Sequence, residues 1–434
     1  MFNFIDIRIA TTTNHLLTCQ SQQKMNARKV YILGGAQTDF SINWAKKGFG
    51  IDTIMSNSFE GALENTLIDL ADIQSIHIGN FVGELFCQQG QLGGVLLQCF
   101  PQLSGIPTAR HEAACASGSM AAFSAMREIE AGYYDLVAVT GVEMMRNVDG
   151  RTASQHLGVA AWTGHEAEDA HYPWVHLFSE IKTFYQERYG LDDAHLAAIA
   201  KVNYANAQRN PQAQTRNWEM SEDSLGEDDV HNPLNAGSLR KSDCGRITDG
   251  SATIFLASES YAQAYAAKRN ITLEDIPYIK GWGHRTAPIE LNHKLGEAKK
   301  SHYPFKHLHH AIQDALSRAK LSDAKELDLI ETHDCFTISE YVALEHFGLA
   351  KPGEAWKVIE EGTIDISGKL PVNPSGGLIG AGHPVGATGV RMLLDAYKHV
   401  AGKAEDYQVE NTQNVGILNI GGSFTTVASF VVGR

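Results

Sequence analysis

Cys115 lies in a sequence context that favours a nucleophilic thiol. It occupies the run His111-Glu-Ala-Ala-Cys-Ala-Ser-Gly, immediately before a helical pattern. The N-terminus of a helix carries partial positive charge, so we expect the thiolate form of Cys115 to be favoured. The small neighbouring side chains leave room for a substrate. A buried structural cysteine is the alternative interpretation.

His383 stands at the tip of a glycine-rich loop, which suits a catalytic base. The loop reads Gly376-Gly-Leu-Ile-Gly-Ala-Gly-His-Pro-Val-Gly-Ala-Thr-Gly, and Pro384 fits the first turn of a helix. A dinucleotide-binding loop is the alternative, because several of the glycines are closely spaced. However, the spacing is GxGxxxG, a proline intrudes and no strand precedes the loop, so we favour the catalytic base.

A third cluster, His333-Asp-Cys-Phe, follows an apolar segment that has the pattern of a strand. Polar residues that follow a strand are where α/β sheets form their sites. His333 and Cys335 therefore join Cys115 and His383 as candidate catalytic residues. A metal site would need a third or fourth ligand at matching spacing. None is visible nearby, so we expect no metal.

The composition indicates a globular protein and excludes several function classes. The 434 residues are 43% hydrophobic, and 50 acidic against 36 basic side chains give a net charge of -14. A surface this acidic repels phosphate backbones, so we expect no nucleic-acid partner. No apolar run approaches the roughly 18 residues of a membrane span, so we expect no membrane association. The six cysteines lack paired spacing, which favours reduced thiols and a cytoplasmic location.

Strands and helices alternate along the chain, which predicts an α/β fold. The predicted strands are continuously apolar, so we expect a sheet that is buried on both faces. Helix 117–132 with strand 136–141 is matched by helix 385–400 with strand 415–422, which indicates two duplicated halves. The other predicted strands are 29–35, 75–80, 249–258 and 327–332, and the other predicted helices are 58–72, 173–189, 193–207 and 309–320.

The change of composition along the chain predicts four parts. Residues 1–24 lack a strand or helix pattern, so we expect a poorly ordered extension with Met25 opening the folded domain. We assign 25–145 and 243–265 to the N-terminal half, and 266–434 to the C-terminal half. The segment 146–242 is rich in aromatic and polar residues and poor in strand patterns. We expect it to be a mostly helical insertion over one end of the sheet.

Taken together, these motifs resemble the thiolase family. The matching stretches are Cys115-Ala-Ser-Gly, Asp249-Gly-Ser-Ala and Gly382-His-Pro-Val-Gly-Ala-Thr-Gly. His333-Asp-Cys-Phe is similar to the sterol-carrier-protein-type thiolases, where other thiolases carry Asn-Glu-Ala-Phe. The resemblance covers nearly all of the chain from Met25 onward. It implies a five-layered αβαβα fold, in which 146–242 is the loop domain that covers CoA and substrate.

The resemblance also implies a reaction and a role for each site residue. His383 would deprotonate Cys115, whose thiolate would take the acyl group of an acyl-CoA. Cys335 would move the α-proton of acetyl-CoA, since the usual C-terminal CxG cysteine is replaced by Asn419. The backbone N–H groups of Cys115 and Gly421 would bind one oxyanion, while His383 and a water held by His333 would bind the other.

The substrates implied are acetyl-CoA with an acyl-CoA, or a 3-ketoacyl-CoA with CoA, and no cofactor is expected to stay bound. Thiolases are usually homodimers or homotetramers, and we expect a homo-oligomer here. Three alternatives remain open. They are a ketoacyl synthase that is loaded from an acyl carrier protein, a 3-hydroxy-3-methylglutaryl-CoA synthase, and a partner-dependent or non-catalytic acyl-CoA-binding subunit.

Overall fold

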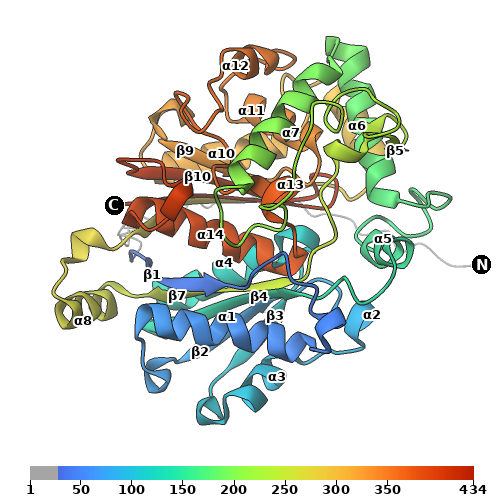
Figure 1. Ribbon diagram of the computed structural model, residues 1–434. Helices are drawn as coiled ribbons and strands as arrows, with labels where there is room; N and C mark the ends of the chain where they lie inside the picture. Colours follow the sequence, from blue (N-terminus) through green and yellow to red (C-terminus); the bar gives the residue numbers. More distant parts are fainter. Residues whose placement is uncertain (1–27) are drawn as a thin grey trace, which may run out of the picture.

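The computed structural model describes residues 28–434, and the extension predicted for 1–24 lies outside them. Nine strands are hydrogen-bonded in the order β3-β2-β4-β7-β1-β8-β11-β10-β9 (Figure 1). A separate hairpin pairs β5 with β6. The strands are β1 Tyr31–Gln37, β2 Ser75–Gly79, β3 Thr108–His111, β4 Leu136–Glu143, β5 Leu234–Ala236, β6 Leu239–Arg240, β7 Gly250–Ala257, β8 Tyr278–Thr286, β9 Leu329–Thr332, β10 Asn414–Gly421 and β11 Thr426–Gly433.

The strand pairing shows the duplication directly. In the first half β2 pairs in parallel with β3 and β4, and antiparallel pairs then link β4 to β7 and β7 to β1. In the second half β9 pairs in parallel with β10, and antiparallel pairs link β10 to β11 and β11 to β8. An isolated parallel bridge from Ile330 to Val372 stands where β3 stands in the first half. The pairing therefore places β9 in the second half where β2 stands in the first.

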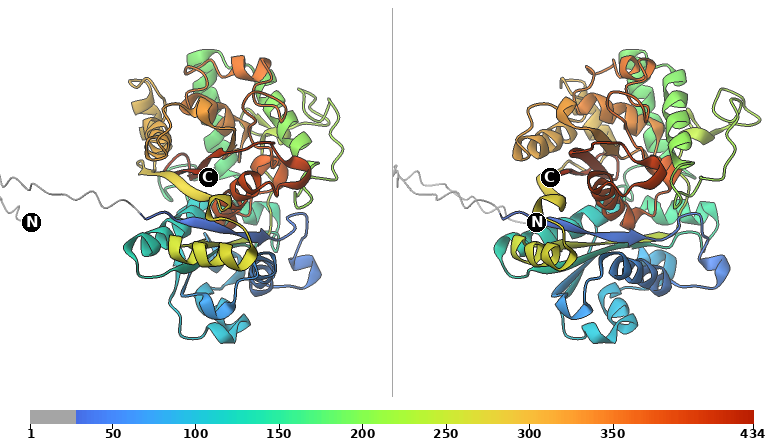
Figure 2. Two further views of the ribbon diagram at one scale, coloured as in Figure 1. Left: turned by 90° about the vertical axis from the view of Figure 1, so that its left-hand side faces the viewer. Right: turned by 60° about the vertical axis from the view of Figure 1, so that its left-hand side comes forward.

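The helices complete five layers around these strands. They are α1 Ile51–Thr66, α2 Gly83–Cys87, α3 Leu92–Cys99, α4 Ser117–Ala131, α5 Gly150–Gly158, α6 Pro173–Tyr189, α7 Asp193–Ala207, α8 Glu259–Arg269, α9 Leu291–Ala298, α10 Lys306–Arg318, α11 Thr337–His346, α12 Trp356–Glu360, α13 Gly377–Ala381 and α14 Val385–Ala401. The two halves are joined where Tyr31 of β1 pairs with Tyr278 of β8. Helices α4 and α14 lie between the halves, with α1 and α3 outside one and α10 and α11 outside the other (Figures 1 and 2). The predicted fold is confirmed.

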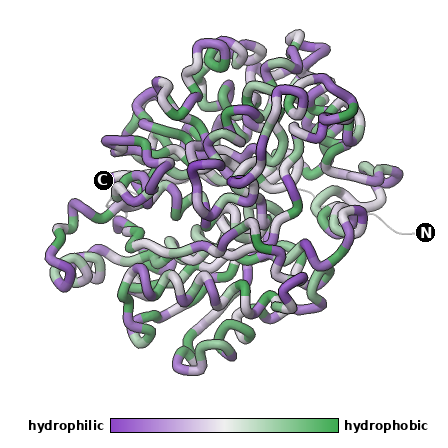
Figure 3. The backbone as a smooth tube through the Cα atoms, in the orientation of Figure 1, coloured by the Kyte–Doolittle hydropathy of each residue, from purple (hydrophilic) through white to green (hydrophobic). Residues whose placement is uncertain are grey.

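The central helices are buried because strands lie on both sides of them. One apolar cluster joins α4 and α14 to strands of both halves, including Val139 of β4 and Ile417 of β10. Hydrophilic stretches gather in the outer loops (Figure 3). The loops that carry Cys115 and His383 lie directly before α4 and α14. Because these two helices pack in the interior layer, they fix the positions of the two loops relative to each other. Within residues 28–434, no helix has the length and apolar character needed to cross a membrane.

The insertion contains α5, α6 and α7 with the β5–β6 hairpin, as expected for a mostly helical segment. Helix α7 packs against α11 and α13 of the second half, and α6 packs against α5. The insertion therefore lies beside the loops that follow β9 and precede α14 (Figure 1). The four domain boundaries given above stay predictions.

Candidate active site

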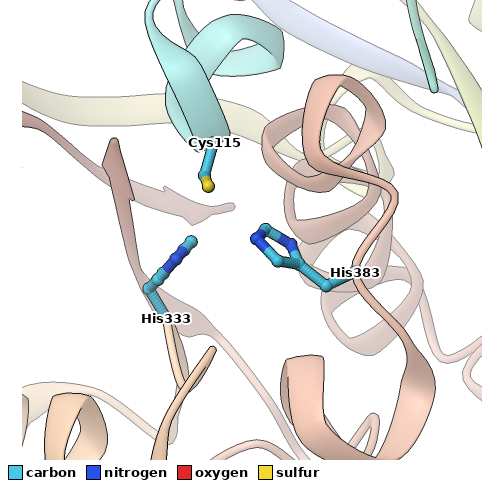
Figure 4. A group of neighbouring side chains, drawn as sticks. All are labelled: Cys115, His333 and His383. Carbon is cyan, nitrogen blue, oxygen red and sulfur yellow. The ribbon is translucent and has the colours of Figure 1, made fainter. Parts of the chain in front are cut away.

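Three loops bring Cys115, His333 and His383 together (Figure 4). Cys115 lies just before α4, His333 directly follows β9, and His383 lies between α13 and α14. The Cys115 sulfur and one ring nitrogen of each histidine all lie within 4.8 Å of one another. The three residues lie in separate sequence motifs. The fold brings these motifs together where the two duplicated halves meet.

The chain approaches Cys115 through a strained turn. Ala114 has a φ of 50°, a left-handed conformation that non-glycine residues rarely adopt. Gly421 at the end of β10 lies very close to the same turn. A Cβ placed on Gly421 would lie only 2.2 Å from the Ala113 carbonyl oxygen. Only glycine allows this approach. The turn and the end of β10 therefore hold the Cys115 thiol in a defined place.

Cys115 is a neutral thiol in the protein alone. Burial raises its pKa to about 12, and the charge of Glu143 adds to this effect, while N–H groups of Gly422 and of Cys115 itself oppose it. The expectation that the helix N-terminus favours the thiolate is therefore wrong. Loss of solvation outweighs the two backbone N–H groups at this half-buried position. A neighbouring base has to take the proton as the thiol reacts.

His383 is oriented as such a base. Its Nδ1 lies 2.8 Å from the Thr388 Oγ1, and that hydroxyl donates its single hydrogen to the Pro384 carbonyl oxygen at 3.1 Å. Nδ1 must therefore carry the proton that Thr388 accepts. The other nitrogen, Nε2, is buried and has no hydrogen-bond partner within residues 28–434. Burial lowers the pKa of His383 to about 3, so the ring is neutral and Nε2 offers a lone pair.

His333 is held from the opposite side by Asn419. The Asn419 Nδ2 lies 3.1 Å from the His333 Nδ1 and 3.1 Å from the Cys115 carbonyl oxygen. Burial, together with His383 and Arg391, holds the pKa of His333 well below its usual value, so this ring is also neutral. The sequence identified Asn419 only as the replacement of a cysteine. Its contact with His333 depends on the strand pairing of β9 with β10.

Cys335 borders the same cavity as these three residues. Its sulfur lies 3.7 Å from the Ser339 Oγ, and its carbonyl oxygen accepts a hydrogen bond from Gly245 at 2.9 Å. Burial raises the pKa of Cys335 far above its ordinary value, and the nearby Cys115 adds to the rise. Cys335 is therefore a second neutral thiol, available to donate a proton.

The cavity itself has a volume of about 260 Å³ and is mostly apolar. Gly422 borders the cavity together with Cys115, whereas Gly421, the predicted oxyanion glycine, does not. The insertion supplies much of the wall, including Leu157, Trp174 and Phe178. Among the described residues, Arg246 is the one lysine, arginine, aspartate or glutamate on its wall. The sequence had not singled out Arg246, Gly422 or Thr388, although Thr388 lies in the glycine-rich motif.

The same three-residue cluster has a spacing that would suit a metal ion. A zinc site would use a thiolate and two imidazole lone pairs. The expectation of no metal stays a prediction.

Family models match both halves of the chain. The model "Thiolase, N-terminal domain" matches residues 30–260, and "Thiolase C-terminal domain-like" matches residues 291–434. The chain belongs to the thiolase family. The predicted resemblance is thereby confirmed. The family match and the acetyl-CoA acetyltransferase relatives support a CoA-dependent thiolase, an acyltransferase, as its activity.

Curated relatives and solved structures agree with this thiolase assignment. An acetyl-CoA acetyltransferase of Methanothermobacter thermautotrophicus is 31% identical over 94% of this chain and 100% of its own. Sterol carrier protein 2 of Homo sapiens is 24% identical over 91% of this chain and 70% of its own. The fold matches the Ltp2-ChsH2(DUF35) aldolase with a TM-score of 0.76, at 16% identity, over 94% of this chain and 98% of that chain. It matches human mitochondrial 3-ketoacyl-CoA thiolase with a TM-score of 0.66, at 17% identity, over 94% of this chain and 99% of that chain.

Proposed function

We propose that this thiolase works through an acyl group carried on Cys115. The observation that carries the proposal is the unpaired Nε2 of His383, which is buried within reach of the Cys115 sulfur. His383 takes the thiol proton as the sulfur attacks the carbonyl carbon of an acyl-CoA. The bond from acyl carbon to CoA sulfur then breaks, and His383 returns the proton to the CoA thiolate. The acyl group is left on Cys115.

Cys335 donates the α-proton when the carbon–carbon bond breaks and accepts it when that bond forms. In cleavage, a 3-ketoacyl-CoA is attacked at its keto carbon by Cys115, and the bond to the α-carbon breaks. The resulting enolate takes a proton from Cys335 to become acetyl-CoA, and CoA then removes the remaining acyl group from Cys115. In condensation, the proton of Cys335 first passes to His383, and the Cys335 thiolate then accepts the α-proton of acetyl-CoA. Its neutral state matches the donor role in cleavage.

Two sets of donors stabilise the oxyanions in this scheme. Backbone N–H groups of Cys115 and Gly421 bind the oxyanion of the tetrahedral intermediate on Cys115, and the Gly422 N–H lowers the pKa of the Cys115 thiol. His333 and protonated His383 serve the enolate oxygen of acetyl-CoA. The assignment of Gly421 stays a prediction, because Gly422 is the residue that borders the cavity.

The walls of the cavity indicate which part of the substrate they bind. Apolar and aromatic side chains suit the pantetheine arm and a hydrocarbon acyl chain. Arg246 is a charged residue on this apolar wall. It takes part in none of the arginine ion pairs in the described part of the chain. Its guanidinium lies 5.5 Å from the Trp218 ring, and its Nε has no hydrogen-bond partner there. We infer that Arg246 binds an anionic group of the CoA thioester.

A second copy and a different subunit are both proposed as partners. Strand β3 ends the sheet and pairs only with β2 among residues 28–434, so its other edge is open for pairing. This supports the expected homodimer or homotetramer. A partner-dependent enzyme is the other candidate. It is supported by a relative named as a benzoylsuccinyl-CoA thiolase subunit, at 25% identity, and by the match to the Ltp2-ChsH2(DUF35) aldolase, whose name includes a second component. A cytoplasmic location stays a prediction.

One experiment tests the proposed function. The purified chain is incubated with acetoacetyl-CoA and CoA, then with longer 3-ketoacyl-CoAs, and the loss of the ketoacyl absorbance is followed. We expect CoA-dependent loss that disappears in Cys115→Ala. Acyl exchange without cleavage in the purified chain would favour the partner-dependent candidate. Cleavage that persists in Cys115→Ala would overturn the proposal.

A further inference from the structure

Asn419 occupies the position at which most thiolases carry the cysteine of the CxG motif, and it makes three hydrogen bonds. It is fully buried in β10, two residues before Gly421. Its Oδ1 accepts from the Ser119 Oγ at 2.7 Å. Its Nδ2 lies 3.1 Å from both the Cys115 carbonyl oxygen and the His333 Nδ1. The side chain thus connects the start of α4 with the loop after β9.

The orientation of the Asn419 amide follows from its partners. A backbone carbonyl oxygen can only accept, so the amide atom that faces Cys115 must be the nitrogen. The oxygen then faces the Ser119 hydroxyl, which donates to it. Because both ends of the amide are assigned, the nitrogen is also the atom that faces His333. Its two hydrogens serve the Cys115 oxygen and the His333 Nδ1.

This orientation fixes the proton on His333. An amide nitrogen donates and does not accept, so the His333 Nδ1 must offer its lone pair. A neutral imidazole has one proton, which therefore resides on Nε2. The Nε2 has no hydrogen bond within residues 28–434, and His333 borders the catalytic cavity. His333 thus presents an N–H to the substrate, whereas His383 presents a lone pair.

We propose that Asn419 is a positioning residue that holds His333 as its Nε2–H tautomer. His333 then donates to the enolate oxygen and cannot accept the α-proton. This inference rests on the proposed thiolase reaction. It also explains the loss of the cysteine at position 419: the position orients a neighbour instead of moving a proton. The α-proton is thereby left to Cys335.

The variant Asn419→Asp tests the proposal, because it keeps the shape of the side chain and removes the amide donor. A carboxylate accepts from the His333 Nδ1–H, so the lone pair of Nε2 would face the substrate. We expect thiolysis to slow by about 100- to 1,000-fold, the usual effect of losing one oxyanion donor. Exchange of acetyl groups between acetyl-CoA and CoA does not form the enolate, so we expect it to fall much less.

A double-mutant cycle with His333→Asn separates positioning from a structural role. Asparagine at position 333 has an amide donor and no tautomer to set, and other thiolases carry asparagine there. In that background Asn419→Asp should slow thiolysis by far less than in the wild type. If the same factor is lost in both backgrounds, Asn419 acts only on the Cys115 turn and the proposal is wrong.

Nitrogen-15 NMR of histidine-labelled protein reads the tautomer directly and needs only proteins with Asn419 intact. The His333 signals are identified by their absence from His333→Asn. The proposal requires an Nδ1 without hydrogen and a protonated Nε2, and the opposite pattern would overturn it. Wild-type rates distinguish the failure of the underlying function. A wild type with neither exchange nor thiolysis refutes the thiolase reaction, whereas normal thiolysis in Asn419→Asp refutes only the role of Asn419.

Discussion

At the residue scale, two neutral thiols and two neutral imidazoles share one cavity, and their hydrogen bonds give each a different task. The Thr388 hydroxyl leaves His383 with a free lone pair, and Asn419 leaves His333 with a free N–H. Cys115 is close enough to His383 to lose its proton to that lone pair. Cys335 lies on the same cavity and has no comparable base among its hydrogen bonds.

These tasks predict that the two cysteines can be separated by experiment. Acyl exchange needs Cys115 and His383, whereas thiolysis and condensation also need a group that moves the α-proton. We expect Cys335→Ala to retain acetyl exchange between acetyl-CoA and CoA and to lose at least roughly a hundredfold in thiolysis. Cys244→Ala is the matched control, since Cys244 borders the cavity outside the predicted motifs. Near-normal condensation in Cys335→Ala would mean that another residue moves the proton.

Arg246 gives a second prediction at this scale. A charged hydrogen bond contributes roughly 1.5–3 kcal/mol when its partner is present. Arg246 is partly exposed, so we expect Arg246→Gln to raise the KM for acetoacetyl-CoA by about tenfold, with kcat little changed. The same variant should not change the KM for acetoacetyl-pantetheine, which lacks the CoA phosphates. Equal losses with both substrates would show that Arg246 binds a different part of the substrate.

At the element scale, the end of β10 and the turn before α4 form one rigid support for Cys115. A Cβ on Gly421 would lie 2.2 Å from the Ala113 carbonyl oxygen, so Gly421→Ala must push the two segments apart. We expect a loss of roughly 1–3 kcal/mol in the free energy of unfolding and a large fall in acyl exchange. Thermal denaturation and the exchange rate measure the two effects.

Gly296 provides the matched control for Gly421. It lies in α9, and a Cβ there would meet nothing within 4 Å. Gly296→Ala should leave activity unchanged and stabilise the protein by up to about 1 kcal/mol, since alanine favours a helix. If Gly421→Ala behaves like Gly296→Ala, the contact between β10 and the Cys115 turn does not position the thiol.

The elements also show what the sequence could and could not predict. Helices α6 and α7 have the predicted bounds, because Pro173 and Gly190 mark the two ends of α6 and Asp192 caps α7. The helix predicted at 58–72 is instead α1, which begins at Ile51 and ends at Thr66, where Leu67 adopts a left-handed φ of 53°. No residue type at position 67 signals that stop. The predicted strand 29–35 likewise begins two residues later, at Tyr31, where pairing with Tyr278 starts.

The site was predictable in its motifs and not in its contacts. Cys115, His333, Cys335 and His383 stand out by their neighbours in the sequence, and the structure places all four on one cavity. The contact of Asn419 with His333 joins residues that are 86 positions apart. It depends on the register of β10 against β9, which no local pattern encodes. The position of Arg246 on the cavity wall likewise depends on how the insertion packs.

At the scale of the whole molecule, buried ionisable groups predict how stability varies with pH. Burial raises the pKa of Glu143 to about 7 and that of Glu345 to about 8, so the folded chain keeps protons that the unfolded chain loses above its ordinary carboxyl pKa. Stability from these groups is present in acid and is lost as the pH rises toward 8. Burial lowers the pKa of His346 to about 3 and that of His399 to about 4, so stability is lost below pH 6.5 as the unfolded chain takes up protons.

We therefore expect a melting temperature that is highest between about pH 4.5 and 6.5 and falls on both sides. Lys294 and Lys280 oppose the alkaline fall, because burial lowers the pKa of Lys294 to about 7 and that of Lys280 below its usual value. The buried carboxyls with raised pKa values outnumber these two lysines. Calorimetry from pH 4 to pH 9 checks the shape, and Glu345→Gln should flatten the alkaline side. A melting temperature that rises steadily from pH 6.5 to 8 would contradict this prediction.

The acylation of Cys115 is the step on which every other assignment depends. It is measured by incubating the purified chain with acetoacetyl-CoA without CoA, digesting it in acid and locating the added acetyl mass on its peptides. We expect the label on the peptide that contains Cys115, and no label in Cys115→Ala. Label on Cys244 or Cys335 in the wild type would contradict the assignment of Cys115 as the nucleophile.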